Sequence, residues 1–382
     1  MPRYSGKWNL TEQMQAIGAS NWPSPPIIRV TYAAGNNSYG GFGLNNVVNR
    51  SSPVQISAGL TQIESTGANS GANMAVNKSG QLWAIGGSNG YGAFGLGDTV
   101  QRSSPVQVGA LTNWSKVVVN AVTTCHALKT DGTWWAWGYG EYGPHNDRDN
   151  RNSPVQVGTD TDWADIFFTT FGAIVIKTNG DAYVYGRNLG GALGDGTTTT
   201  RSSPIQIGSG TAWAKGSGTN SALLVSTGGA LYACGLNGSG DLGLNNITDQ
   251  TSLQQVGSLT NWSTPSMSDG GTSCTTTDGA VFTWGNNFYG SLAHNDVIYR
   301  SSPVQVTGSW SHAAITGNGT FYGINTSGEL FSCGRNENGE PGLNIAGGAA
   351  GRRSSPIQVG SKTDYNGIYL TKDYQLLVSA ET

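Results

Sequence analysis

The sequence predicts an all-β fold of the β-propeller type, and three observations support this prediction. First, one phrase, Arg300-Ser-Ser-Pro-Val-Gln-Val306, recurs along the chain at an almost constant interval. Second, glycine supplies 58 of the 382 residues, which is about twice its usual share. Third, only 11% of the residues are charged, against about 25% in typical domains, so too few Glu, Lys and Arg are present to cover helical surfaces.

The recurring phrase divides the chain into seven repeats. Its proline position is filled by Pro53, Pro105, Pro154, Pro204, Leu253, Pro303 and Pro356. Subtraction of neighbouring positions gives intervals of 52, 49, 50, 49, 50 and 53 residues. A fixed period of this size indicates a solenoid, a propeller or an array, in which one repeat cannot bury its apolar face alone. One repeat array therefore accounts for residues 27–382 as a single domain.

Residues 1–26 are predicted to form a leader with a short helix and an extended connector. Asn9 can cap the helix, with Glu12 three residues later, and Gly18 can end it. Three prolines then stiffen the connector. A helix this short is marginal in water unless it packs on something. We expect it to dock on its own propeller or on a neighbouring subunit of a homo-oligomer, through Trp8, Leu10, Met14, Ile17 and Trp22.

Each repeat predicts four short strands. In one repeat, a strand over residues 126–130 meets the turn Asp131-Gly132 and returns over residues 133–137. Dipeptides of this kind tolerate the positive φ values that tight hairpins require. A glycine-rich loop follows, then a strand at Pro-Val-Gln-Val, then a strand that begins near an aromatic residue. Four short strands in about fifty residues are typical of a propeller blade.

Two glycine-rich loops read Gly186-Arg-Asn-Leu-Gly-Gly-Ala-Leu-Gly194 and Gly235-Leu-Asn-Gly-Ser-Gly-Asp-Leu-Gly243. They resemble the G-x-N-x-x-G-x-L-G signature of the RCC1 repeat family, and the Pro-Val-Gln-Val strand and the Asp-Gly hairpin fit the same family. The resemblance runs from about Ile28 to the C-terminus and implies a seven-bladed β-propeller. Some copies depart from the signature, since its Asn is displaced to Asn89 in one loop and is absent from Gly138-Tyr-Gly-Glu141 in another.

Both ends of the chain are expected to contribute to ring closure. Residues 369–379 resemble a full hairpin with its turn at Asp373-Tyr374, and residues 30–35 resemble the second strand of that same hairpin. The two ends thus overlap by one strand. We expect the N-terminal strand to join C-terminal strands in one composite blade, which would hide both sheet edges.

Charge and hydropathy exclude several classes of partner. The formal net charge is −3 and the isoelectric point is near 5.8, so nucleic acid and anionic membranes are not expected partners. The N-terminus lacks the apolar stretch of a secretory signal, and no window approaches a membrane span. We therefore expect a soluble chain that is made in the cytoplasm.

The four cysteines are predicted to be buried free thiols. Cys234 and Cys333 take equivalent positions two repeats apart, and Cys125 and Cys274 are assigned to another shared position three repeats apart. Equivalent positions in non-adjacent blades are too far apart for a disulfide. The spacing of the cysteines does not match a metal site either.

No catalytic, cofactor or metal site is predicted, and the protein is interpreted as a non-enzyme. The four histidines lie in different repeat phases and share no neighbourhood with a phase-matched Ser, Cys or carboxylate pair. Catalysis requires an acid, a base and a nucleophile that are positioned together. The histidines are His126, His145, His294 and His312.

Six arginines recur three residues before the blade proline. A ring of guanidinium groups on one face could bind anions. We expect instead that each arginine caps loop carbonyls or stacks on an aromatic ring of its own blade, for which the guanidinium fork is suited. The six are Arg50, Arg102, Arg151, Arg201, Arg300 and Arg353.

Tyr39, Tyr91, Tyr142 and Tyr289 each stand just before the second glycine of a glycine-rich loop. Exposed tyrosines on one rim of a ring would form a recognition surface, because tyrosine offers rigid contact area and a polar tip at low entropy cost. These four are the predicted binding residues. Ordinary loop packing is the alternative.

The RCC1 resemblance implies one candidate function. The best-known member of that family is a nucleotide exchange factor for a small GTPase that also docks on chromatin, with a protruding insertion, a charged face and a basic tail. Here the repeat spacing leaves no room for such an insertion, charge is sparse and the leader is not basic. Nucleotide exchange, or a regulatory protein-interaction scaffold, is therefore the alternative function.

The leader favours a different function. Its segments Tyr4-Ser-Gly-Lys-Trp-Asn-Leu10, Met14-Gln-Ala-Ile-Gly18 and Asn21-Trp-Pro23 are similar to the openings of tail and other virion proteins of marine phages. This resemblance implies a virion structural protein of a tailed bacteriophage, as a tail fibre, a tail tip or a surface decoration. The leader would then bind other virion proteins, and the propeller would bind a host surface receptor or glycan, or would only decorate the particle.

Overall fold

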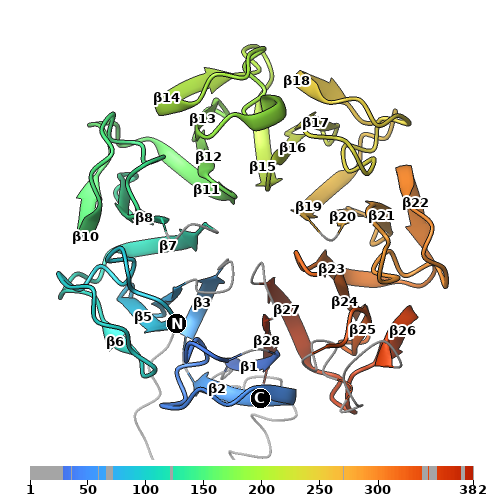
Figure 1. Ribbon diagram of the computed structural model, residues 1–382, viewed down its shortest axis with the longest axis horizontal. Coiled ribbons are helices and arrows are strands. Elements are labelled where there is room, and N and C mark those ends of the chain that lie inside the picture. The colour runs from blue at the N-terminus through green and yellow to red at the C-terminus, as the bar shows by residue number, and fades with distance from the viewer. Residues whose placement is uncertain are drawn as a thin grey trace, which may run out of the picture.

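The computed structural model describes residues 29–35, 37–58, 60–65, 72–120, 124–269, 271–337, 343, 351–370 and 375–381. These residues form seven four-stranded sheets, arranged as blades around a common axis (Figure 1). The one helical element with described bounds is the 3-10 turn η1 (Leu189–Gly191). The predicted all-β propeller class is confirmed. The predicted leader helix within residues 1–26 lies outside the described residues.

We name the blades A to G in their order around the ring, and each is given from its inner strand outward. Blade A consists of β27 (Tyr365–Leu370), β28 (Gln375–Glu381), β1 (Arg29–Gly35) and β2 (Arg50–Ala58). Blade B consists of β3 (Leu60–Ser65), β4 (Asn73–Asn77), β5 (Leu82–Gly86) and β6 (Val106–Gln107). Blade C consists of β7 (Trp114–Val119), β8 (Thr124–Lys129), β9 (Trp134–Gly138) and β10 (Arg151–Gln156). Blade D consists of β11 (Trp163–Thr169), β12 (Gly172–Lys177), β13 (Ala182–Gly186) and β14 (Arg201–Ile207). Blade E consists of β15 (Trp213–Gly218), β16 (Ser221–Ser226), β17 (Leu231–Gly235) and β18 (Gln250–Gln255). Blade F consists of β19 (Trp262–Ser268), β20 (Gly271–Thr276), β21 (Val281–Gly285) and β22 (Arg300–Val306). Blade G consists of β23 (Trp310–Ile315), β24 (Thr320–Asn325), β25 (Leu330–Gly334) and β26 (Arg353–Gln358).

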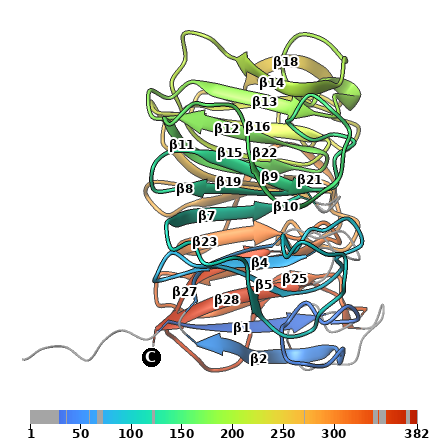
Figure 2. The ribbon, with the colours of Figure 1, turned by 90° about the vertical axis from the view of Figure 1, so that its left-hand side faces the viewer.

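The chain runs outward through each blade, so inner strands such as β7 and β11 lie near the axis and outer strands such as β10 and β14 lie at the rim (Figure 1). The strands run across the thickness of the ring (Figure 2). Because consecutive strands are antiparallel, the loops between third and fourth strands share one face with the first-to-second hairpins. We call this the glycine-loop face. The tight turns between second and third strands lie on the opposite face, which we call the turn face.

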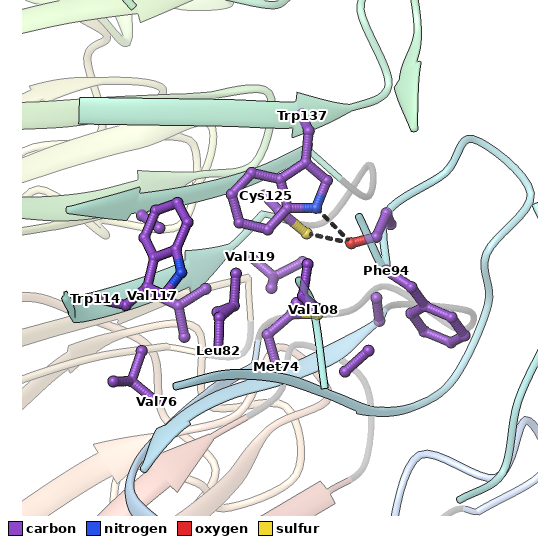
Figure 3. Packing of buried hydrophobic residues seen from close by; sticks show 14 residues of the cluster. Met74, Val76, Leu82, Phe94, Val108, Trp114, Val117, Val119, Cys125 and Trp137 are labelled. Atoms are coloured by element: carbon purple, nitrogen blue, oxygen red, sulfur yellow. Dashed lines mark hydrogen bonds between the residues drawn. The ribbon is translucent and has the colours of Figure 1, made fainter. Parts of the chain in front are cut away.

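The hydrophobic core lies between blades and not within them. One cluster joins Met74 and Leu82 of blade B to Val117 and Trp137 of blade C (Figure 3). Five further clusters join the following pairs of neighbouring blades in the same way. The second strand of a blade is therefore covered on both sides, and all six residues of β16 are buried. This arrangement explains why no single repeat could persist alone.

In blades C, E and F, the fourth residue of the third strand contacts the glycine-rich loop of the blade before it. Trp137 Nε1 donates to Ala93 O in the glycine-rich loop of blade B at 2.8 Å (Figure 3), and Trp284 Nε1 donates to Asp241 O of blade E at 2.8 Å. Cys234 holds the same strand position, and its Sγ lies 3.7 Å from Ala192 O of blade D. Hydrogen bonds therefore support the apolar contacts between neighbouring blades.

Ring closure uses two strands from each end of the chain. Residues 29–35 pair with residues 375–381, which pair in turn with residues 365–370. The predicted composite blade is confirmed, but the predicted overlap of one strand is wrong. The segment after Tyr369 does not supply both the second and the third strand. Gln375–Glu381 is the second strand and Arg29–Gly35 is the third, while the predicted turn at Asp373-Tyr374 lies outside the described residues.

All four cysteines are buried and free, as predicted. Their assigned positions need one correction. Cys125 pairs with Trp137 in the register of blade C, whereas Thr272 pairs with Trp284 in the register of blade F. Cys274 therefore lies two positions beyond the equivalent of Cys125. Burial raises the pKa of each thiol above its ordinary value, so the thiolate form is disfavoured.

Asp241, between blades E and F, predicts a specific pH dependence of stability. Burial raises its pKa to about 6, although the Asn286 N–H donates to its carboxylate at 3.2 Å. A folded-state pKa above the unfolded value means that the charged form is disfavoured by folding. Stability should therefore rise as pH falls from about 7 toward 4. We expect Asp241→Asn to stabilise the protein by about 1–2 kcal/mol at pH 7.5 and to have little effect at pH 4, as measured by urea unfolding.

Asp278→Asn is the matched control in blade F. Asp278 is exposed, and a hydrogen bond from Thr276 lowers its pKa. Its replacement should not stabilise the protein at any pH. Equal unfolding midpoints for Asp241→Asn and the wild type at pH 7.5 would contradict the inferred burial cost.

Candidate functional site

The glycine-rich loops of blades A to F each pack against the next blade. In blade B, Gly92 has a φ of +77°, and a Cβ there would lie 2.5 Å from the Cα of Asn152 in blade C. In blade E, the Asn245 N–H donates to Ser301 O of blade F at 2.7 Å. The loops are therefore held in fixed positions relative to one another, and side chains from different blades can form one surface.

A buried asparagine organises most of these loops from within. In blade F, Asn287 Oδ1 accepts from the Leu292 N–H at 2.9 Å. Its Nδ2 donates to Asp296 O and to Ile298 O, each at 3.1 Å. One side chain thus replaces backbone partners that the irregular loop cannot supply. The asparagines that share this position are Asn37, Asn89, Asn188, Asn237, Asn287 and Asn336, all at most 1% exposed.

The arginines before the blade proline are tied to their own loops. Arg300 makes a two-point ion pair with Asp296, at 3.0 and 2.8 Å, and donates to Ile298 O at 2.8 Å. Hydrogen bonds from Arg300 lower the pKa of Asp296 to about 2. The expected capping of loop carbonyls is confirmed for Arg102, Arg151 and Arg300, whereas Arg201 donates to the side chains of Asp195 and Thr197. The aspartate partner is an addition. The other pairs are Arg102 with Asp98, Arg151 with Asp147, and Arg201 with Asp195.

The four predicted tyrosines all lie on the glycine-loop face, in blades A, B, C and F. Tyr39 and Tyr91 are 45% and 48% exposed, whereas Tyr142 and Tyr289 are partly buried. The structure connects only two of the four. Tyr91 and Tyr142 are joined through Tyr139, at ring-centroid distances of 4.6 and 6.4 Å.

The contacts of Tyr91 and Tyr142 continue across three blades. Tyr142 packs edge-on against Phe171 of blade D at 5.5 Å, and the Arg187 guanidinium lies 5.0 Å from the Phe171 ring. We call Tyr91, Tyr139, Tyr142, Phe171 and Arg187 the aromatic strip. None of its members is fully buried. Sequence reasoning missed Tyr139, Phe171 and Arg187, because they come from different positions of the repeat.

The Tyr139 hydroxyl is held within the strip by a charged partner. It donates to the Glu141 carboxylate in the same loop. This hydrogen bond is the main reason that the pKa of Tyr139 rises to about 12. The strip therefore presents phenol rings and one exposed guanidinium, with the Glu141 carboxylate beside Tyr139. Such a surface is suited to flat contact with a partner.

Tyr289 belongs to a separate cluster between blades F and G. The guanidinium groups of Arg352 and Arg335 lie 4.7 and 5.2 Å from its ring. Both arginines also pair with Glu337. Phe288, which is 60% exposed, packs nearly perpendicular to Tyr289 at 4.9 Å. Tyr289 thus serves as a packing platform for two cations, and Phe288 is the hydrophobic residue of this cluster that extends well into solvent.

Two of the histidines, His126 and His145, lie near each other in blade C. His126 is fully buried and contacts the Tyr185 hydroxyl of blade D at 2.8 Å. Burial, with a smaller effect from His145, lowers its pKa to about 3. His145 contacts the carbonyl of Ala136, the register partner of His126. Because His126 has no solvent access, this pair has a structural place between blades C and D.

The described ranges hold neither a metal-binding cluster nor a membrane-spanning helix. Within them, no group of three or more His, Cys, Asp and Glu side chains is arranged to hold a metal ion. The same residues contain no helix with the length and apolarity of a membrane span.

The predicted docking residues of the leader, Trp8, Leu10, Met14, Ile17 and Trp22, lie outside the described residues.

Comparisons with known proteins agree with the propeller architecture. Residues 278–321 match the Regulator of chromosome condensation (RCC1) repeat. The human protein WBSCR16 is similar in structure, with a TM-score of 0.77 and 17% identity over 93% of this chain and 99% of that one. Prp20p from Saccharomyces cerevisiae is similar with a TM-score of 0.78 and 14% identity, over 93% of this chain and 92% of that one. Yeast RCC1 (Prp20) bound to Kap60 gives a TM-score of 0.78 and 15% identity, over 94% and 89%. At these identities the likeness establishes the fold alone.

Proposed function

We propose that the protein is a non-enzymatic binding propeller that recognises a macromolecular partner through the aromatic strip. The observation that carries this proposal is the continuous run of ring contacts from Tyr91 to Phe171, ending under Arg187. Tyrosine and arginine are enriched among the residues that dominate binding energy at interfaces. The interblade loop contacts hold these side chains in place, which lowers the entropy cost of binding.

A protein partner is favoured over a nucleic acid. The structure of Prp20p was described with its binding properties to Gsp1p and histones, and yeast RCC1 was solved bound to Kap60. A propeller of this fold, Prp20, thus binds other proteins, and this supports the same class of role here. The formal net charge of −3 gives no general attraction to phosphate backbones. We therefore favour the hypothesis that the protein is a regulatory or structural protein-interaction scaffold.

A place on a phage particle is a narrower form of the same proposal. It rests on the resemblance of residues 4–23 to the openings of virion proteins, and the propeller would then present the aromatic strip to a host surface receptor or glycan. Genes for tail, portal or capsid proteins next to this gene would support it. A bacterial or eukaryotic regulatory locus would count against it.

Nucleotide exchange is the second candidate, and the structural likeness to Prp20p favours testing it. It predicts that the purified protein accelerates the release of labelled GDP from a small GTPase. The Tyr91→Ala/Tyr142→Ala variant should slow that release if the strip is the contact surface. No acceleration over a broad panel of small GTPases would remove this candidate.

The binding role can be tested without knowing the natural partner. Peptides selected from a random display library against the wild-type propeller should bind Tyr91→Ala/Tyr142→Ala at least about 30-fold more weakly, because two central aromatic contacts are removed. Dissociation constants from surface plasmon resonance would measure the loss. A glycan array with the same two proteins would test the glycan form of the proposal.

Tyr39→Ala is the matched control, since Tyr39 is as exposed as Tyr91 but does not belong to the aromatic strip. The selected peptides should bind it like the wild type. Peptides that bind Tyr91→Ala/Tyr142→Ala as tightly as the wild type would place the preferred contact surface elsewhere and overturn the proposal.

A further inference from the structure

The inner strands enclose a cavity along the ring axis that the proposed binding face does not use. Its volume is about 570 Å³, and residues of β7, β11, β15, β19 and β23 line it. Each inner strand starts at the turn face; for example, the Trp163 N–H donates to Gly132 O in the second-to-third turn of the preceding blade. The first residues of these strands therefore surround the turn-face mouth of the cavity.

The layer at this mouth is polar and carries unequal charge. It is formed by the third residues of five inner strands. Lys116, Lys215, Thr264 and His312 line the cavity, and Asp165 lies between Lys116 and Lys215. In β3 and β27 the same register position holds Gln62 and Gly367, which are neutral by type. Two lysines therefore share one aspartate, and the layer has a net charge of +1 when His312 is neutral.

The two lysines are not equally engaged. Lys116 Nζ lies 2.6 Å from one oxygen of Asp165 and 4.5 Å from the centre of the Phe167 ring. Lys215 Nζ lies 3.5 Å from the other oxygen of Asp165, and its side chain is 50% exposed. An anion at the mouth can therefore approach Lys215 without breaking the short Lys116–Asp165 pair.

The cavity wall becomes apolar next to the charged layer. Phe167 and Val118 line it on the side of blades C and D, and Met267 and Ile315 line it on the side of blades F and G. Hydroxyl groups of Ser217 and Ser266 lie among them. A ligand that fits this sequence of surfaces has an anionic head at the mouth and a compact apolar body along the axis.

We propose that the axial cavity binds a small carboxylate with an aromatic or aliphatic body. The carboxylate pairs with Lys215 at the turn-face mouth, and the body packs on Phe167 and Val118. The volume is within the range of small-molecule sites. A charged hydrogen bond to the ammonium group in a partly dry channel supplies orientation and affinity together.

Naphthalene-2-carboxylate and its neutral isostere naphthalene-2-carboxamide are the probes for this site. At pH 8, where His312 is neutral, the wild type should bind the carboxylate at least about tenfold more tightly than the amide, because only the carboxylate gains the charged contact. Isothermal titration calorimetry measures both. Inorganic phosphate, which has charge but no apolar body, should not compete at equal concentration.

Three variants locate the contacts. Lys215→Gln should weaken carboxylate binding about tenfold and leave amide binding unchanged. Phe167→Ala should weaken both probes. Lys78→Gln is the matched control, since it removes a positive charge from a turn of blade B on the same face, and it should change neither.

Other outcomes would overturn the proposal. These are equal affinity of the wild type for the two probes, unchanged carboxylate affinity in Lys215→Gln, or an equal loss in Lys78→Gln.

Glu64, at the register position of Phe167 in β3, gives a further test. Its replacement by Gln removes a negative charge from an inner strand and should leave carboxylate binding unchanged or tighter, so weaker binding would contradict the assigned ligand charge. The melting temperature of each variant separates lost binding from lost folding.

Discussion

Removal of residues 375–382 is expected to abolish the cooperatively folded ring. These residues include β28, which pairs along its whole length with β1 and also pairs with β27. Without it, β1 and β2 lose their link to the C-terminal strands, and blade A ceases to exist as a sheet. The total stability of a folded domain is only about 5–15 kcal/mol, so the loss of one blade and of its two interfaces exceeds what the remaining contacts can offset.

The measurement for this truncation is near-UV circular dichroism together with calorimetry. We expect loss of the tryptophan signal and of a single unfolding transition, with aggregation through the newly exposed edges of β1 and β27. Removal of residues 1–26 is the control, because the described blades do not include them, and it should leave the transition intact. A truncated protein that unfolds cooperatively at the wild-type temperature would show that blade A is not required for closure.

Features that repeat along the chain could be predicted from the sequence. The turn dipeptides, the aromatic residue at the start of six of the seven inner strands and the recurring proline are local signals, and each appears many times. For this reason the propeller class, the blade content and the composite blade were predictable. The position of Cys274 was not, because the glycine-rich loop before Pro303 is two residues longer than the loop before Pro154. Counting back from the proline therefore placed Cys125 and Cys274 at one position, while the strand register separates them.

The candidate site was only half predictable for a different reason. Tyr91 and Tyr142 hold the same position in neighbouring repeats, so their repeat phase placed them on one face. Tyr139, Phe171 and Arg187 have no shared phase, and only interblade packing brings them to the strip. The Asp–Arg pairs, in contrast, had a local signal that was overlooked, since Asp98, Asp147 and Asp296 each precede the arginine by four residues.

Replacement of Trp284 is expected to cause the largest loss of stability among single core substitutions. Trp284 is fully buried between blades E and F, lies 6.2 Å from the Trp262 ring and donates to Asp241 O at 2.8 Å. Trp284→Ala should lower the free energy of unfolding by about 3–5 kcal/mol, because it leaves a large cavity and removes one of the two side-chain hydrogen bonds to Asp241 O, the other coming from Thr272 Oγ1. Urea unfolding would measure the change, and Phe288→Ala, at an exposed site in the next loop, should stay within about 0.5 kcal/mol of the wild type.

Trp284→Phe separates the two contributions to this loss. Phenylalanine retains most of the apolar volume but cannot donate to Asp241 O, so a cost of about 1–2 kcal/mol is expected. The equivalent strand position holds Ile85 in blade B, which has no donor and is nevertheless buried. The hydrogen bond is therefore a local addition to a contact that apolar packing already makes. If Trp284→Phe costs as much as Trp284→Ala, the interblade contact depends on the hydrogen bond and not on the volume that the indole fills.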